Sequence, residues 1–422
     1  MKIAIDLGAS QTRVMAAQQG SEVKVLPNTY VSVEIGTDVR LERVDGPLES
    51  NLDVSISRLT AREEDMYFPV RVLLGELAAR HSTRLRQPQA LEPKHLQQIN
   101  YCSILTALAT QVIDLGMDLK KQQNVELYLA LPPVEVRADG LVEYIEDVLK
   151  DRFAVEFPLD NVSVDLNITK IHVFEESRLA CIAYSFNEDL TPTELGKEIH
   201  NNQMTVLSVD IGASTTDLVI IKNGTYRENS GATIKRGGNF IAAELRNLVE
   251  QKHKFQPTTE DIAVAVTTGT LKKGANVLDV TDLLKQAKDT CAKEMIADIE
   301  DYFTRQAISP NSIEVVLVSG GGSMASYKVE AGKNKETTEP FAFYLERELK
   351  ALSDLRVEYF SANSETSPRE ANIIGLIIRA RVDIAKKEKV EGRENKASVK
   401  DTKTSKKAAG VDTAVEDEPN VE

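Results

Sequence analysis

An internal repeat constrains the fold of this chain more than any other feature of its sequence. Residues 5–12 read IDLGASQT, and residues 209–216 read VDIGASTT. In each copy an apolar strand meets an Asp, then a Gly two residues on, a small residue, a hydroxyl side chain and a Thr that opens a second strand. Glycine allows a tight hairpin with positive φ and a close approach of the backbone to a ligand. Consecutive amides in such a turn form a concave nest for phosphate oxygens. The repeat therefore predicts duplicated α/β lobes that present two hairpins to one polyphosphate.

The repeat also predicts a metal site and a set of phosphate contacts. Asp6 and Asp210 stand at equivalent strand ends, and Mg²⁺ is held by few protein oxygens because it keeps much of its water shell. We therefore expect these two carboxylates to bind Mg²⁺ through water. The predicted phosphate-binding residues are Gly8, Ala9, Ser10, Gln11, Thr12, Gly212, Ala213, Ser214 and Thr215.

A third glycine-rich segment follows another apolar strand. Residues 316–324 read VLVSGGGSM, and beside the repeat this pattern predicts a floor where backbone passes close to a flat base and ribose. The predicted contacts here are Gly320, Gly321, Gly322, Ser323 and Met324. Gly237 and Gly238, which precede an amphipathic segment, form a weaker candidate of the same kind.

Composition excludes several other classes of protein. A net charge of −14 and a pI of about 5.1 argue against a broad DNA-binding face, which needs positive charge to displace counterions. The three cysteines have no paired spacing, so neither a disulfide framework nor a zinc site is indicated. The chain enters a strand at its first residues and has no apolar run of the roughly 20 residues that a transmembrane helix needs. We expect a cytoplasmic protein without a membrane partner.

Periodicity places further elements along the chain. Helical patterns cover residues 93–119, 141–149, 283–305 and 368–380, and another helix begins near Glu176. Residues 162–168 and 170–173 read as two strands. Residues 385–422 contain no aromatic residue, Leu, Ile or Met and many charged ones, which predicts disorder. A solubilising tail and a tail that binds a partner or tunes a filament are both open.

These motifs resemble those of the superfamily of actin, sugar kinases and seventy-kilodalton heat-shock chaperones. The two repeats match its two phosphate motifs, and residues 316–324 match its adenosine motif. Residues 176–184 and 369–375 look like its two connecting helices, with small residues that let the helices cross closely. The spacing is most similar to ParM-type plasmid-segregating bacterial actins, through residues 26–29, 129–132 and 173–177.

The resemblance implies an α/β, two-lobed actin-like fold made of duplicated ribonuclease-H-like domains, each with a smaller inserted subdomain. Lobe I would span residues 1–174 with an insert at about 31–80, and lobe II residues 175–384 with an insert at about 240–310. Residues 385–422 would form the charged tail. Base-contacting side chains would lie on the helix at residues 283–305.

The resemblance also assigns catalytic roles. Asp6 and Asp210 would orient Mg²⁺ and its waters, the hairpin residues would hold the β- and γ-phosphates, and Glu176 would polarise the attacking water. Glu175 is a competing choice, but Ser177 stands where the family usually has Pro, which favours Glu176. Asn239 departs from the pattern, since relatives often have an acid there.

The function implied is a filament-forming hydrolase of ATP, or of GTP, that assembles with copies of itself and engages plasmid DNA through a DNA-binding adaptor protein. No direct contact with nucleic acid is expected. A cell-shape or organelle-positioning filament is the main alternative, and a small-molecule kinase is a further one. A chaperone is disfavoured because only a short polar tail follows the second connecting helix.

Overall fold

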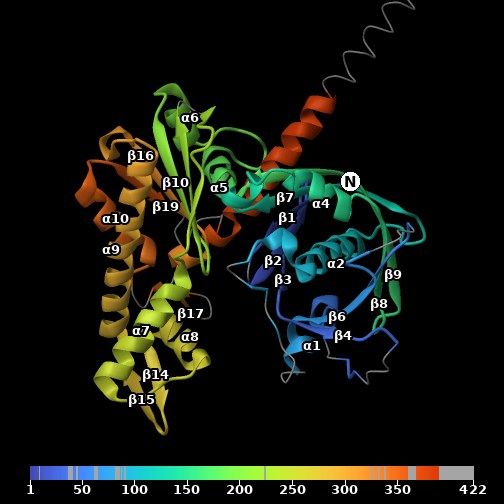
Figure 1. The fold of residues 1–422 in the computed structure, drawn as a ribbon, viewed down its shortest axis with the longest axis horizontal. Helices are drawn as coiled ribbons and strands as arrows, with labels where there is room; N and C mark the ends of the chain where they lie inside the picture. Colours follow the sequence, from blue (N-terminus) through green and yellow to red (C-terminus); the bar gives the residue numbers. More distant parts are fainter. Residues whose placement is uncertain are drawn as a thin grey trace, which may run out of the picture.

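The computed structural model describes residues 1–8, 10–36, 41–43, 46–60, 65–80, 86, 88–89, 92–222, 225–324, 327–330, 333–336, 339–359 and 367–388. Two α/β lobes lie side by side, one coloured blue to green and the other green to orange in Figure 1. None of the helices in this part of the chain has the length and apolar character needed to cross a bilayer.

Lobe I is built on one mixed sheet, which has nine strands among the described residues in the order β3-β2-β1-β7-β9-β8-β5-β6-β4. The strands are β1 (Lys2–Leu7), β2 (Gln11–Ala16), β3 (Lys24–Pro27), β4 (Tyr30–Val33), β5 (Asp53–Arg58), β6 (Val70–Leu74), β7 (Gln123–Leu131), β8 (Arg152–Phe157) and β9 (Val162–Glu175). The helical segments are η1 (Leu48–Ser50), α1 (Gly75–Arg80), η3 (Lys94–Leu96), α2 (Gln98–Asp114), α3 (Pro133–Val136) and α4 (Leu141–Leu149). Helix α2 packs on the face of the sheet near β1 and β2 and buries nearly its whole length.

Two expectations for lobe I are refined. The stretch predicted as an insert at residues 31–80 supplies β4, β5 and β6, which continue the main sheet because β5 pairs with β8. The two strands predicted at residues 162–168 and 170–173 form one long strand, β9, whose register against β7 shifts between Val125 and Glu126.

Lobe II repeats the core of this topology. Its sheet has the order β12-β11-β10-β16-β19, with β13 pairing to β11. In both lobes the first strand pairs antiparallel with the second and parallel with a third, which pairs parallel with a fourth. The strands are β10 (Thr205–Ile211), β11 (Thr216–Lys222), β12 (Thr225–Tyr226), β13 (Ala232–Ile234), β16 (Val315–Ser319) and β19 (Arg356–Tyr359). The predicted duplication of the α/β lobes is confirmed.

The remaining elements of lobe II surround this sheet or extend from it. The helical segments are α5 (Glu176–Ser185), α6 (Glu194–Asn201), α7 (Gly238–His253), α8 (Thr259–Thr268), α9 (Thr281–Arg305), η4 (Pro310–Ser312), η5 (Gly321–Met324), α10 (Phe341–Leu352) and η6 (Pro368–Glu370). Two hairpins are β14 (Thr270–Lys273) with β15 (Asn276–Asp279), and β17 (Tyr327–Glu330) with β18 (Lys333–Glu336). Helices α7 and α8 and the β14–β15 hairpin lie toward one end of the lobe, within the predicted insert at residues 240–310 (Figure 1).

Two helices connect the lobes. Helix α5 and the final helix, residues 371–388, share an apolar cluster with the lobe I sheet that includes Ala4, Ala130 and Leu179. The helices cross so closely that a Cβ on Gly375 would overlap the carbonyl of Leu179, as the small residues predicted. The final helix runs to residue 388, past the predicted start of the tail at 385, because its Lys and Glu residues are good helix formers. Residues 389–422 lie outside the described residues.

Candidate functional site

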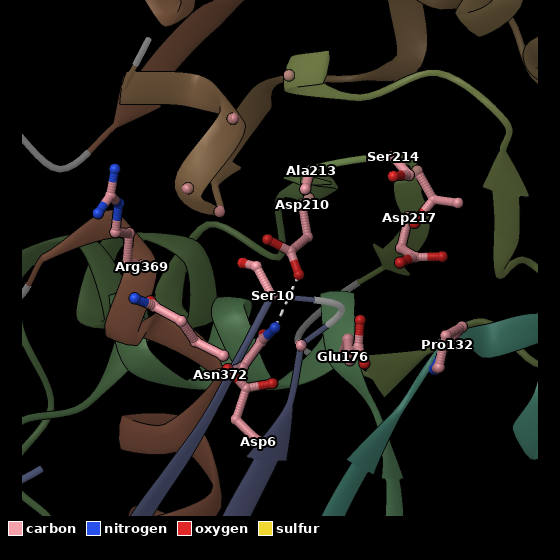
Figure 2. A pocket seen from close by; sticks show the side chains of 18 of the residues that line it. Asp6, Ser10, Pro132, Glu176, Asp210, Ala213, Ser214, Asp217, Arg369 and Asn372 are labelled. Carbon is pink, nitrogen blue, oxygen red and sulfur yellow. Dashed lines mark hydrogen bonds between the residues drawn. The ribbon is translucent and has the colours of Figure 1, made fainter. Parts of the chain in front are cut away.

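A cavity of about 560 Å³ lies between the lobes, where the two repeated hairpins face each other (Figure 2). Most residues of the sequence-predicted site line it: Asp6, Gly8, Ser10, Gln11, Glu176, Asp210, Gly212, Ala213, Ser214, Thr215, Gly238, Gly320, Gly321, Gly322 and Met324. Segments from both ends of the chain therefore converge on one space.

The two hairpins share the same strand register and the same closing hydrogen bond. Leu7 is paired with Thr12, and Ile211 with Thr216, at the same position of each hairpin. The amide of Gly8 donates to the Gln11 carbonyl at 3.0 Å, and its counterpart in lobe II, the Gly212 amide, makes the equivalent bond at 2.8 Å. The sequence repeat is therefore a structural repeat.

Of the two reasons predicted for the glycine in each hairpin, the positive φ is wrong. Neither Gly8 nor Gly212 has a positive φ. A Cβ on Gly8 would instead lie 2.8 Å from the Gln11 carbonyl oxygen, and one on Gly212 would lie 3.1 Å from that of Thr215. Glycine is needed because the turn folds tightly back on itself.

Three predicted contacts do not line the cavity. Thr12 is buried and donates its hydroxyl to Asn28 Oδ1 at 2.7 Å. Ser323 donates its hydroxyl to the Gly320 carbonyl at 2.7 Å. Gly237 lies behind the second hairpin, where its Cβ position is 2.7 Å from the Gly212 carbonyl oxygen. These residues support the turns from behind. Ala9 lies outside the described residues.

The glycine segments form a compact floor by packing on one another. A Cβ on Gly322 would lie 2.6 Å from the Gly212 carbonyl oxygen, and one on Gly238 would lie 2.9 Å from the Gly322 Cα. The Gly238 amide donates to that same Gly212 carbonyl at 2.9 Å. Backbone therefore meets backbone here, which leaves a flat surface toward the cavity.

The side chains at the outer end of this floor differ from those expected. Val266 and Thr267 of α8 line the cavity, whereas no residue of α9 does among the described lining residues. The expectation that α9 supplies base contacts stays a prediction, and the helix side chains that line this part of the cavity come from α8. Asn239 also lines the cavity and donates to Ser214 Oγ at 3.2 Å.

The second hairpin is surrounded by carboxylates. Asp210 accepts hydrogen bonds from Asn372 Nδ2 at 2.7 Å (Figure 2) and from Ser319 Oγ at 3.2 Å, and burial raises its pKa. Asp217 stands opposite Asp210 in the β10–β11 pair. Burial, reinforced by the Asp210 charge, raises the pKa of Asp217 to about 7. Burial thus favours the protonated form of both carboxylates.

The first hairpin has a cation in the corresponding place. Arg13 stands opposite Asp6 in the β1–β2 pair, with its Nη1 at 3.6 Å from Asp6 Oδ2. Its Nη2 donates to Gln11 Oε1 at 3.1 Å. Arg13 lines the cavity, so this hairpin offers a guanidinium as well as backbone amides.

Glu176 begins α5 and faces the cavity in an ion pair with Lys94 of η3. Burial raises the pKa of Glu176, and nearby Asp217 and Asp6 raise it further, whereas Lys94 opposes the shift. Burial alone would lower the pKa of Lys94, but Glu176 raises it above its ordinary value. Lys94 is thus a fixed cation that favours the ionised form of Glu176.

The competing residue, Glu175, points elsewhere. Its Oε1 lies 3.1 Å from Arg137 Nε and accepts from the Tyr226 hydroxyl at 2.8 Å. It does not belong to the cavity lining. Of the two neighbouring carboxylates, Glu176 is the one that can reach a bound ligand.

The acidic cluster fits a hydrated divalent cation. No three His, Cys, Asp or Glu side chains in the described part of the chain come close enough to hold a metal directly. Asp6 and Asp210 nevertheless line the same cavity. Mg²⁺ keeps several of its waters and needs few protein oxygens, so two carboxylates in one cavity fit such an ion.

Several cavity residues were missed from the sequence. Arg13 and Asp217 each follow a repeat by one residue, so a longer comparison of the two copies would have found both. Asn372 lies within the second connecting motif, residues 369–375, where only the small residues had been singled out. Lys94 had no signal, because it comes from a short irregular segment whose place beside Glu176 depends on tertiary folding.

Comparisons with known proteins agree with this geometry. Residues 208–328 match the family model described as archaeal actin homologue MreB-like, C-terminal. The solved structure of the actin-like protein Alp7A has a TM-score of 0.68 at 17% identity, with 93% of this chain and 99% of that chain covered. A ParM from a 15-stranded Clostridium botulinum filament gives 0.60 at 18% identity, with 89% and 97% covered. Bacillus thuringiensis ParM with ATP gives 0.59 at 14% identity, with 90% and 98% covered.

The chain has an actin-like fold. The resemblance to actin-like proteins, including those of the ParM type, is confirmed at the level of the fold. A search of curated protein sequences gave no significant match.

Proposed function

We propose that this actin-like protein binds and hydrolyses a nucleoside triphosphate in the interlobe cavity and polymerises with copies of itself in a nucleotide-dependent way. The observation that carries the proposal is the pair of equivalent hairpins that face one cavity from opposite lobes, with Glu176 between them. A ligand that touches both hairpins binds better when the lobes are closed, so it shifts the population of lobe arrangements.

The chain's own residues suit phosphoryl transfer to water, which needs mainly positioning and charge neutralisation. The hairpin amides and Arg13 would hold the phosphates, and Glu176 would orient the attacking water. The ion pair with Lys94 would favour the carboxylate form of Glu176 against the effect of burial. Asp6 and Asp210 would hold Mg²⁺ through water, and the ion would supply positive charge to the phosphate oxygens.

ATP is the preferred nucleotide in this proposal, with GTP as the alternative. One structure of similar fold is a Bacillus thuringiensis ParM with ATP. The apolar and hydroxyl side chains of Val266 and Thr267 line the outer end of the cavity, where a base would lie. Neither side chain has the fixed donors and acceptors that would select strongly for guanine.

The biological role that we propose is plasmid segregation through a DNA-binding adaptor. Another structure of similar fold comes from a 15-stranded ParM filament of Clostridium botulinum, which supports assembly as the general mode of action. The net charge of −14 favours an adaptor over direct contact with DNA. A filament that positions cell structures would use the same nucleotide site, so cargo is a separate question.

Sedimentation tests the proposal. Full-length protein is centrifuged with ATP, GTP or neither, in buffer with and without Mg²⁺, and released phosphate is measured in parallel. We expect pelleted protein and phosphate release only with nucleotide and Mg²⁺. Phosphate transfer to a small molecule without any polymer would overturn the filament proposal in favour of a kinase.

A further inference from the structure

A cluster of polar side chains links the lobes behind Glu176, outside the cavity lining. Arg137 follows α3 in lobe I, and each nitrogen of its guanidinium has a partner. Its Nε lies 3.1 Å from Glu175 Oε1, its Nη1 donates to the Gly231 carbonyl at 2.6 Å, and its Nη2 donates to the Tyr226 hydroxyl at 3.2 Å. Gly231 and Tyr226 belong to lobe II, and Glu175 is the last residue of β9. The Arg137 side chain therefore joins lobe I to lobe II and to the end of β9.

The lobe II side of this contact has no spare room. A Cβ on Gly231 would overlap Arg137 Nη2 and would lie 2.7 Å from the Pro133 Cβ. The Tyr226 hydroxyl also donates to Glu175 Oε1, and the Arg178 guanidinium lies 5.0 Å from the centre of the Tyr226 ring. The lobes therefore touch here through directional bonds, and rotation of one lobe against the other must break them.

The cluster is connected to Glu176 through the chain and to Asp217 through the chain and one hydrogen bond. Glu175 is directly followed by Glu176 at the start of α5. Gly231 is followed by β13, where Thr233 donates to Asp217 Oδ1 at 2.5 Å. Movement at Arg137 would thus displace both Glu176 and the carboxylate of Asp217, although Arg137 does not line the cavity.

We propose that Arg137 is a positioning residue that clamps the lobes behind Glu176 and fixes the Glu175–Glu176 pair for hydrolysis. This inference rests on the proposed function. A planar guanidinium with three directed partners suits the role better than an ammonium, which is a point charge on a flexible stem. A shift of about 1 Å in a catalytic group can lower a rate by roughly two orders of magnitude.

The first test compares single-turnover hydrolysis with nucleotide affinity in full-length Arg137→Met and Arg137→Lys. We expect Arg137→Met to bind ATP within a few-fold of wild type but to hydrolyse it about ten- to a hundredfold more slowly. Arg137→Lys should recover part of the rate, because lysine can satisfy some but not all of the three partners. Arg152→Gln removes an exposed lobe I arginine that pairs with Asp165, and it should behave as wild type.

A second readout follows the lobes themselves. Spin labels on cysteines introduced at Glu76 and Lys272, which are exposed in lobe I and lobe II, report the distance across the cleft. The three native cysteines are buried, which favours selective labelling. With Mg²⁺ and a non-hydrolysable ATP analogue, Arg137→Met should show a longer and broader distance distribution than wild type.

The outcomes separate the two proposals. If wild type hydrolyses no nucleotide, the proposed function fails. If wild type is active and Arg137→Met has an unchanged rate, the positioning role is wrong. A second pattern would also contradict the role. In it Arg137→Met loses nucleotide affinity, hydrolysis rate and melting temperature together, the label distance stays unchanged, and Arg137→Lys recovers nothing. That pattern would show an effect on stability alone.

Discussion

The two repeated hairpins share their strand register and closing hydrogen bond but have opposite charges beside the Asp. Both close with a hydrogen bond from the first glycine, and both end in a buried Thr. In lobe I the residue opposite the Asp is Arg13, whereas in lobe II it is Asp217. The same close contact makes glycine necessary in both turns, whereas the charge opposite the Asp is positive in one hairpin and negative in the other.

The support behind the turns also differs. In lobe I the side chain of Asn28 accepts from the Thr12 hydroxyl and donates to the Gly8 carbonyl at 2.6 Å. In lobe II backbone groups take both roles, since Thr216 donates to the Arg236 carbonyl at 2.7 Å and the Gly238 amide donates to Gly212. The first turn therefore depends on one side chain, and the second on a neighbouring loop.

Of the changes that test the difference between the hairpins, removal of the Arg13 charge should have the largest effect. In Arg13→Gln we expect ATP affinity to fall by about one to two orders of magnitude, because loss of one member of a buried charge pair costs ~2 kcal/mol or more. Titration calorimetry with MgATP measures the change. Lys121→Gln removes an exposed charge in the same lobe and serves as the control. Equal affinities for Arg13→Gln and wild type would show that the charge difference between the hairpins has no role in binding.

Loss of the supporting side chain should have a somewhat smaller effect. Asn28→Ala leaves the buried Thr12 hydroxyl and the Gly8 carbonyl without their partner, which should lower the free energy of unfolding by about 2 kcal/mol. Urea unfolding followed by circular dichroism gives this value. An unchanged unfolding midpoint would mean that the first turn stands without Asn28.

The smallest expected effect is on thermal stability, and it comes from Asp217 of lobe II. This effect depends on pH. The pKa of Asp217 is raised to about 7 in the folded state. Folded protein then binds more protons than unfolded protein between the ordinary pKa of Asp and about 7, so the stability of ligand-free protein falls as pH rises through this window. Asp217→Asn removes the penalty and should melt ~2 °C higher than wild type at pH 8.

The measurement is a set of thermal melts in EDTA across the pH range. The difference between Asp217→Asn and wild type should shrink toward acid pH, where Asp217 is protonated in both states. A constant difference at all pH values would contradict the raised pKa of Asp217.

The sequence predicted the parts of the site that depend on local pattern. The repeated hairpins, the glycine floor and Glu176 could be located because strand, turn and glycine signals lie within a few residues of each other. The lobe duplication followed from the same repeat. Glu176 was preferred to Glu175 through the resemblance, and the structure shows that only Glu176 faces the cavity.

The parts that failed depend on contacts between distant segments. Lys94 meets Glu176 across 82 positions of sequence, and no periodicity marks such a pair. Val266 and Thr267 of α8 line the cavity, although no sequence pattern marked them. The reason for glycine at Gly8 is a backbone contact in three dimensions, which a preference for positive φ does not describe.

Hydrolysis by Glu176→Gln tests the central claim most directly. Wild type and variant are each mixed separately with limiting MgATP. ATP binding and phosphate release are then measured on the same samples. We expect the variant to bind ATP within a few-fold of wild type and to release phosphate about 10²–10⁴-fold more slowly, because it keeps the shape of the side chain but cannot act as a base. Phosphate release at the wild-type rate would contradict the claim that the cavity between the hairpins is a hydrolytic site built around Glu176.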